Sequence, residues 1–80
     1  MIAVKEFITI DQDILFGKPV FKGTRVPVES LIDHLENGIT LDEFLEDFPS
    51  VKKEQAIAIL EIANTILMSS NIEKLYEAVA

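Results

Sequence analysis

The pattern of apolar and polar residues divides the chain into an N-terminal part typical of strands and turns and a C-terminal part typical of helices. In residues 5–10, apolar side chains surround Thr9, which predicts a short strand. Residues 20–22 are the expected partner strand. A ribbon of this size is not stable alone, so we expect it to pack on the helices.

Two short helices are expected next. The first spans about residues 28–37 and ends at Asn37-Gly38, a helix-stop pair. The second begins after Thr40, which forms a capping box with Glu43. Its inner face is expected to carry residues at the spacing i, i+3, i+4, i+7, namely Leu41, Phe44, Leu45 and Phe48.

The third helix is expected to be the longest, over about residues 52–68, with Ser50 as its cap. Only three of the 13 residues from Ala56 to Met68 are polar. A helix that is apolar on most of its circumference is buried on most sides, and an 80-residue chain can hardly surround it. We therefore expect this helix to be the core and part of a homo-oligomer interface, in a dimer or a larger assembly.

A tail helix is predicted over residues 71–79, after a break at Ser69-Ser70-Asn71 and with Ser70 and Glu73 as a second capping box. Its apolar stripe has the pattern of a helix that lies in a groove of a partner, or on its own dimer. The candidate contact residues are Ile72, Leu75, Tyr76 and Val79.

The predicted fold is mainly α: one domain with a short N-terminal β-ribbon (1–27), a three-helix, helix-turn-helix-like core (28–68) and a C-terminal helical tail (69–80). Of the residues, 49% are hydrophobic and none is cysteine, so disulfides and thiolate chemistry are not expected. No signal peptide and no membrane span are expected, because no window approaches 18 unbroken apolar residues. A cytoplasmic protein is the default expectation.

The net charge is −7, and it is unevenly distributed. Residues 1–28 carry +1 and residues 51–80 carry −1, whereas residues 29–50 carry −7 with no lysine or arginine. An acidic block disfavours general affinity for nucleic acid, whose backbone is negative. It suits a basic protein partner better.

Residues 17–28 form the most distinctive motif in the chain. Gly17 and Gly23 are expected at turns with positive φ, because glycine adopts such geometry at little cost. A phosphate-loop interpretation fails, since Pro19 stands where serine or threonine is needed. Arg25 has two interpretations: a structural anchor that caps carbonyls of the first helix or pairs with a carboxylate such as Asp33, favoured on general grounds, or a direct functional contact.

This motif resembles the signature of domain-of-unknown-function family 433, a family of small bacterial proteins. The resemblance covers roughly residues 7 to 68. It implies an antitoxin-like protein encoded beside a PIN-like ribonuclease toxin, with a helix-turn-helix-type helical part. The residues that carry the resemblance, in a structural or partner-contact role, are Gly17, Lys18, Pro19, Gly23, Thr24, Arg25 and Val28.

Candidate chemistry beyond this motif is sparse. His34 is the only histidine, and a metal site would need further ligands that the spacing does not supply, so a half-exposed helix residue is expected. Neither a catalytic set nor a metal or cofactor site is expected. In a helix-turn-helix interpretation, Lys52, Lys53 and Gln55 would begin the recognition helix and contact DNA. Two exposed lysines at a helix start are an equally good interpretation.

The favoured function is thus a non-enzymatic binding module. By resemblance, it is the antitoxin of a type II toxin–antitoxin pair, which neutralises a ribonuclease and helps to repress its own promoter. The alternatives are a stand-alone helix-turn-helix DNA-binding regulator and a structural oligomeric subunit.

Overall fold

Two short strands form an antiparallel pair near the N-terminus. The computed structural model describes residues 3–79. β1 (Ile8–Thr9) pairs with β2 (Val20–Phe21), with Ile8 opposite Phe21 and Thr9 opposite Val20. The expected pairing is confirmed, but the strand is shorter than residues 5–10. The backbone of η1 (Val4–Glu6) is closed into a 3₁₀ turn, whose bonds run to the Ala3 and Val4 carbonyls.

Four α-helices follow, as the apolar periodicity predicts. They are α1 (Glu29–Glu36), α2 (Leu41–Asp47), α3 (Lys53–Leu67) and α4 (Ser70–Val79). The fold is therefore mainly helical with a short N-terminal β-ribbon, which confirms the predicted fold class. A second 3₁₀ turn, η2 (Leu15–Gly17), lies between the two strands.

The ends of α1 and α2 follow the sequence signals. Gly38 has φ of 78°, and the Gly38 and Ile39 N–H groups donate to the Leu35 and His34 carbonyls, which ends α1 in a Schellman motif. The hydroxyl of Thr40 accepts the Glu43 N–H at 3.1 Å, which caps α2.

The expected caps of α3 and α4 are wrong by one or two residues. α3 begins after Lys52, not Ser50, and the side-chain oxygen of Gln55 accepts the Lys52 N–H at 2.9 Å. Ser50 lies two residues too early to reach the free N–H groups of the first turn. At α4, Ser69 precedes the first helical residue, and its hydroxyl accepts the Asn71 N–H.

The core lies between the ribbon and the first three helices. Its buried members come from β2, α1, α2, the loop after α2, and the first half of α3: Phe21, Leu31, Phe44, Val51, Ala56 and Ile59. The rings of Phe21 and Phe44 lie 6.1 Å apart, and those of Phe44 and Phe48 4.9 Å apart. Each core aromatic thus packs against another element or the next turn, which fixes the helices on the ribbon.

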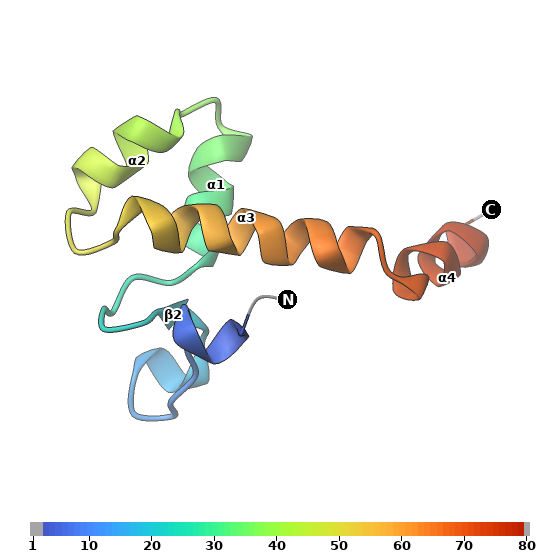
Figure 1. Ribbon diagram of the computed structural model, residues 1–80, viewed down its shortest axis with the longest axis horizontal. Coiled ribbons are helices and arrows are strands. Elements are labelled where there is room, and N and C mark those ends of the chain that lie inside the picture. Colours follow the sequence, from blue (N-terminus) through green and yellow to red (C-terminus); the bar gives the residue numbers. More distant parts are fainter. Residues whose placement is uncertain (1–2, 80) are drawn as a thin grey trace.

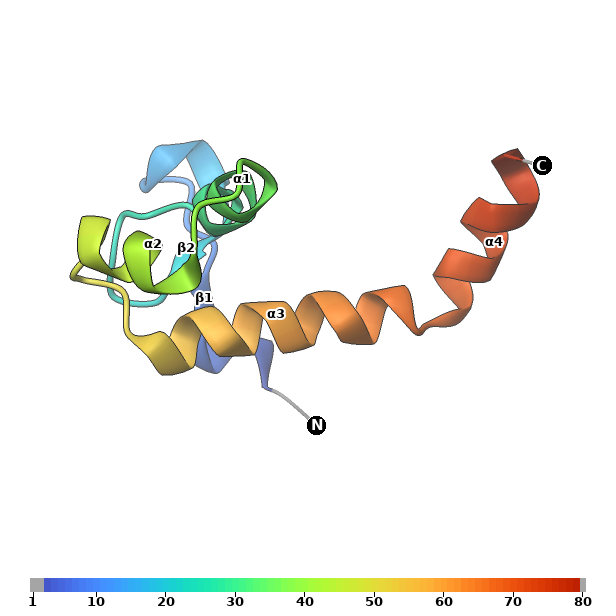
Figure 2. The same cartoon turned by 90° about the horizontal axis from the view of Figure 1, so that it is seen from above.

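The molecule has a body and an arm. We call residues 3–63 the body and residues 64–79, the end of α3 with α4, the arm. In Figures 1 and 2 the arm extends away from the ribbon, α1 and α2. The radius of gyration is 13.9 Å, against about 11.6 Å for a compact chain of this length. Across residues 3–79, no helix is both long and apolar enough to cross a membrane.

The expectation that α3 is buried on most sides holds only for its first half within a single chain. Ala56, Ala58 and Ile59 are buried, whereas Ile66, Leu67 and Met68 are exposed to 59%, 55% and 79%. The body covers the beginning of the helix, whereas residues 3–79 leave the side chains at its end exposed.

Candidate binding surfaces

Residues 17–28 fold into a tight hairpin, which we call the motif hairpin. Phe21 N–H donates to the Val26 carbonyl and Val28 N–H to the Pro19 carbonyl, each at 3.0 Å, and Val20 bridges Pro27. Gly17 and Gly23 have φ of 87° and 79°, as predicted. At Gly17 a side chain would also collide with Gln12, since an added Cβ would lie 2.3 Å from the Gln12 amide nitrogen.

Thr24 closes the tip of the motif hairpin. Its hydroxyl donates to the Phe21 carbonyl at 2.8 Å and accepts the Val26 N–H at 3.0 Å. The hydroxyl therefore joins both sides of the turn, in a partly buried position where a lost partner is costly. Thr24 has a structural role in the motif.

The anchor interpretation of Arg25 is wrong. Its side chain is exposed, and no hydrogen bond or ion pair joins it to another residue within the described part of the chain. The last carbonyls of α1, which such an anchor would cap, already accept the N–H groups of Asn37, Gly38 and Ile39. Arg25 is a surface residue at the tip of the hairpin, available to a partner.

Lys18 and Glu29 form an exposed ion pair between the motif hairpin and the start of α1. The hydrogen bond to Glu29, and then the charge of that carboxylate, raise the pKa of Lys18, with a smaller contribution from Asp33. Because both side chains are more than half exposed, the pair fixes the direction of Lys18 more than it stabilises the fold.

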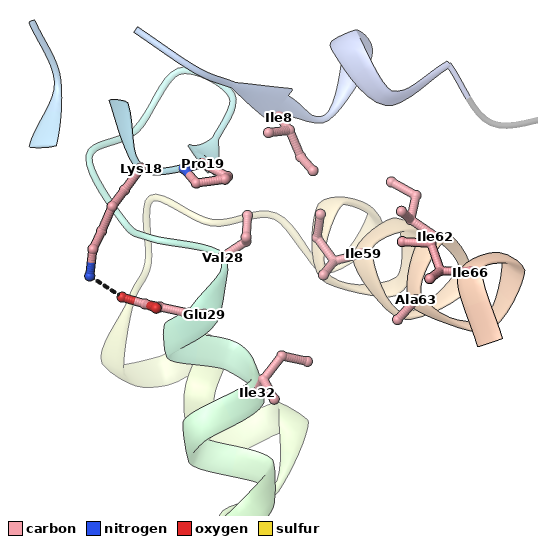
Figure 3. Close-up of a pocket in the computed structure, with 10 residues that line it drawn as sticks. All are labelled: Ile8, Lys18, Pro19, Val28, Glu29, Ile32, Ile59, Ile62, Ala63 and Ile66. Carbon is pink, nitrogen blue, oxygen red and sulfur yellow. Dashed lines mark hydrogen bonds and ion pairs between the residues drawn. The ribbon is translucent and has the colours of Figure 1, made fainter. Parts of the chain in front are cut away.

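The ion pair lies at the rim of an apolar groove of about 370 Å³ (Figure 3). β1, the motif hairpin with α1, and the side of α3 that faces them form it. We call it the groove, and its apolar lining is Ile8, Pro19, Val28, Ile32, Ile59, Ile62, Ala63 and Ile66. Three motif residues, Lys18, Pro19 and Val28, thus help to build a concave binding surface.

The start of α3 is less suited to DNA than the sequence suggests. Lys52 and Lys53 are exposed, as a contact would require. The amide of Gln55, however, accepts the Lys52 N–H and donates to the Lys22 carbonyl at 2.9 Å. A bidentate contact with an adenine would break both bonds. The adjoining cleft of about 550 Å³ contains Glu6 and Glu54 as well as lysines.

The carboxylates of residues 29–50 make the exposed sides of α1 and α2 acidic, and we call these sides the acidic surface. All seven are exposed: Glu29, Asp33, Glu36, Asp42, Glu43, Glu46 and Asp47. Four of them lie on the short helix α2, so that its solvent side is uniformly negative.

The arm presents the candidate contact residues of the tail. Leu75 and Tyr76 are exposed to 61% and 78%, and Ile72 is half-buried. The side chain of Val79 lies outside the described residues. The apolar stripe of α4 is therefore open, beside the exposed end of α3.

His34 is a half-buried structural residue, as expected. Its ring stands edge-on to Phe44 and Phe48, with centroids 5.2 and 5.5 Å away, and its Nδ1 donates to the Ser30 carbonyl at 2.6 Å. Among residues 3–79 no three histidine, cysteine, aspartate or glutamate side chains gather as a metal site would require.

Sequence reasoning missed the groove and one exposed aromatic. The groove combines residues as distant as Ile8 and Ile66, so that only the surplus of apolar positions on α3 could have indicated it. Phe16 is almost fully exposed, in a turn where it and Leu15 both have positive φ. Nothing in the structure explains why a large apolar side chain is placed there.

Comparison with known proteins assigns the body to a family. The family model described as "Protein of unknown function (DUF433)" matches residues 8–63. A curated relative from Sinorhizobium fredii, described as "Uncharacterized protein y4eO", is 40% identical over 53 residues. That alignment covers 66% of this chain but only 24% of the relative. No solved structure matches.

Proposed function

This chain belongs to the DUF433 family of proteins of unknown function, and from that premise we propose that it is a non-enzymatic binding module. Its function is that of an antitoxin in a type II toxin–antitoxin pair, which neutralises a PIN-like ribonuclease in the cytoplasm. The resemblance of the motif suggests this class, and the charge of the surface supports it.

The observation that carries the proposal is the acidic surface. Seven exposed carboxylates occupy residues 29–50 without a lysine or arginine among them. A ribonuclease must attract a polyanion and therefore carries a basic surface around its active site. An acidic surface complements such a site, increases the rate of encounter and excludes RNA from it.

The test begins with co-expression of the chain and the product of the neighbouring gene. We expect a stable complex and relief of nuclease toxicity. If no complex forms and toxicity persists, the antitoxin proposal is wrong.

A pair of matched variants then tests the acidic surface itself. The first neutralises four carboxylates on α2: Asp42→Asn, Glu43→Gln, Glu46→Gln and Asp47→Asn. The control neutralises four exposed carboxylates away from α1, α2 and α4: Glu6→Gln, Asp13→Asn, Glu54→Gln and Glu61→Gln. Both change the net charge by the same amount. Only the first should slow association, by at least about tenfold at low salt, and flatten its salt dependence. Equal effects would show that overall charge alone matters.

A stand-alone DNA-binding regulator is the second candidate. Lys52 and Lys53 are exposed at the start of α3, directly after a short turn, as in a helix-turn-helix. The bonds of Gln55 and the acidity of α2 weigh against strong or specific binding. We therefore propose promoter binding only as a secondary activity of the complex. If the free chain bound its own promoter at physiological salt, DNA binding would become the favoured function and the antitoxin role the second candidate.

The antitoxin acts as a homo-oligomer in this proposal. The exposed apolar end of α3 supports it, because small soluble chains rarely leave such a surface uncovered. A purely structural assembly subunit would share this feature but would bind no nuclease.

A further inference from the structure

The arm ends in an amphipathic helix, α4, whose apolar stripe is largely left exposed by the described part of the chain. α4 carries Ile72, Leu75, Tyr76 and Val79 at the spacing i, i+3, i+4, i+7, the pattern of a helix that lies in a groove. Leu75 and Tyr76 are mostly exposed, and Figure 2 shows α4 projecting beyond the end of α3. The helix is therefore a convex apolar element without a partner.

The groove is the matching concave element. Ile59, Ile62 and Ile66 form its wall on α3, and Ile32 and Val28 stand on the opposite side (Figure 3). Ala63 is the small residue in its lining, so that a second helix can approach α3 closely there. Almost nothing in the groove can form a hydrogen bond, which suits aliphatic and aromatic side chains rather than a polar ligand.

The amount of exposed surface indicates how large the missing contact is. The chain exposes 6035 Å², whereas a compact monomer of 9.0 kDa exposes about 4,900 Å². The excess is about 1,100 Å². A standard interface buries about 800 Å² on each partner. The surplus therefore has the size that a stable dimer of this chain would remove from water.

We propose that α4 of one chain lies in the groove of a second copy, and that the second copy returns the same contact. The inference rests on the homo-oligomer of the proposed function and names its interface. The groove and α4 of the same chain lie close together in the sequence, because Ile66 lines the groove only four residues before α4 begins. A two-fold axis near the end of α3 then places each arm on the other body, as an isologous dimer requires.

The charges favour a second copy over the nuclease as the occupant. The groove contains one basic side chain, Lys18, whose ammonium has three donors, of which Glu29 takes one. Glu73 lies beside the apolar stripe of α4 and can accept another. A basic nuclease is attracted instead to the acidic surface on α1 and α2, of which only Glu29 borders the groove.

Disulfide trapping tests this contact directly, because the natural chain has no cysteine. Leu75→Cys in one preparation and Ala63→Cys in another place one thiol on the arm and one in the groove, on separate molecules. The mixed preparations should form the heterodisulfide at least about tenfold faster than a control with Lys74→Cys, since contact raises the local thiol concentration. Lys74 lies on the opposite side of α4 from the stripe.

A chain with both Leu75→Cys and Ala63→Cys distinguishes exchange from folding back. If the arms are exchanged between chains, this double variant forms an intermolecular disulfide at micromolar concentration. At high dilution, where the chain is a monomer, its two thiols should form an intramolecular disulfide more slowly than that. A fast, concentration-independent intramolecular bond would overturn the proposal, as would a heterodisulfide no faster than the Lys74→Cys control.

A charged residue introduced into the apolar stripe of α4 tests the contact independently, through the dissociation constant of the dimer. Leu75→Asp should raise the dimer dissociation constant by at least about 100-fold, because the change enters both copies of the contact. Lys74→Asp changes the net charge more than Leu75→Asp does. It should nevertheless leave the dimer dissociation constant within about threefold of the natural value, as expected of a surface position. An intact dimer with Leu75→Asp, together with loss of the nuclease complex, would assign α4 to the nuclease and overturn the proposal. All dimer measurements use the chain alone, so they can fail while nuclease neutralisation succeeds, or the reverse.

Discussion

The two halves of α3 have similar composition but opposite surroundings. In the first half, Ala56, Ala58 and Ile59 are buried, and Ala56 and Ile59 share a core with residues of the ribbon, α1 and α2. In the second half, Ile66, Leu67 and Met68 face solvent. The family match ends at residue 63, between these halves. The body is thus a fold that one chain completes, whereas the apolar side chains of the arm are left exposed by residues 3–79.

This contrast separates two kinds of stability. The body is held by a shared core and by the backbone bonds of the motif hairpin, which exist at any concentration. The arm gains burial only when a second molecule covers it, so its contribution depends on chain concentration. Substitutions in the two regions should therefore differ in size and in their response to dilution.

The largest effect is expected in the core of the body. Phe44→Ala should lower the free energy of unfolding by about 3–5 kcal/mol, because the ring is fully buried against Phe21, His34 and Phe48. Urea unfolding at fixed chain concentration measures this loss. Met68→Ala in the arm is the control, and at dilutions where the chain is a monomer it should change the same free energy by less than about 0.5 kcal/mol. Comparable losses would erase the distinction between body and arm.

A smaller effect is expected at the tip of the motif hairpin. Thr24→Val keeps the shape of the side chain but removes the hydroxyl that joins Phe21 and Val26, and should cost about 1–3 kcal/mol. Thr24→Ser retains the hydroxyl and should recover most of that loss. Unfolding in urea compares the two variants. A valine variant as stable as the natural chain would mean that the hydroxyl does not hold the turn.

The smallest effect on stability is expected at the neighbouring residue. Arg25→Ala should leave the free energy of unfolding within about 0.5 kcal/mol, because the side chain is exposed. If the hairpin tip contacts the nuclease, affinity for the nuclease should fall while the melting temperature stays constant. A loss of 2 kcal/mol or more would restore the anchor interpretation.

The sequence predicted the elements well where local chemistry determines them. Thr40, Gly38 and the spacing of Phe44 and Phe48 define α2 and the end of α1, and the structure confirms each. Arg25 was misinterpreted because a pattern does not show which carbonyls are free. In the folded chain, the carbonyls at the end of α1 already accept N–H groups of the residues that follow the helix, and the Arg25 side chain bonds to none of residues 3–79.

The groove could not be predicted because it depends on tertiary packing. Its lining comes from β1, the motif hairpin, α1 and α3, and only folding places Ile8 beside Ile62. The spacing of the motif marks residues 17–28 as distinctive, but it does not indicate which of them shape the turn and which line the groove. Its glycines and Thr24 shape the hairpin, while Lys18, Pro19 and Val28 form part of the groove.

The central claim is that a second copy of the chain covers the arm. The molecular mass of the protein in solution tests that claim most directly. Sedimentation equilibrium of the natural chain, from submicromolar to about 100 micromolar, should give a dimer of twice 9.0 kDa that dissociates on dilution. Leu75→Asp should shift the midpoint of dissociation to at least about 100-fold higher concentration. A single species of 9.0 kDa across the whole range would contradict the account.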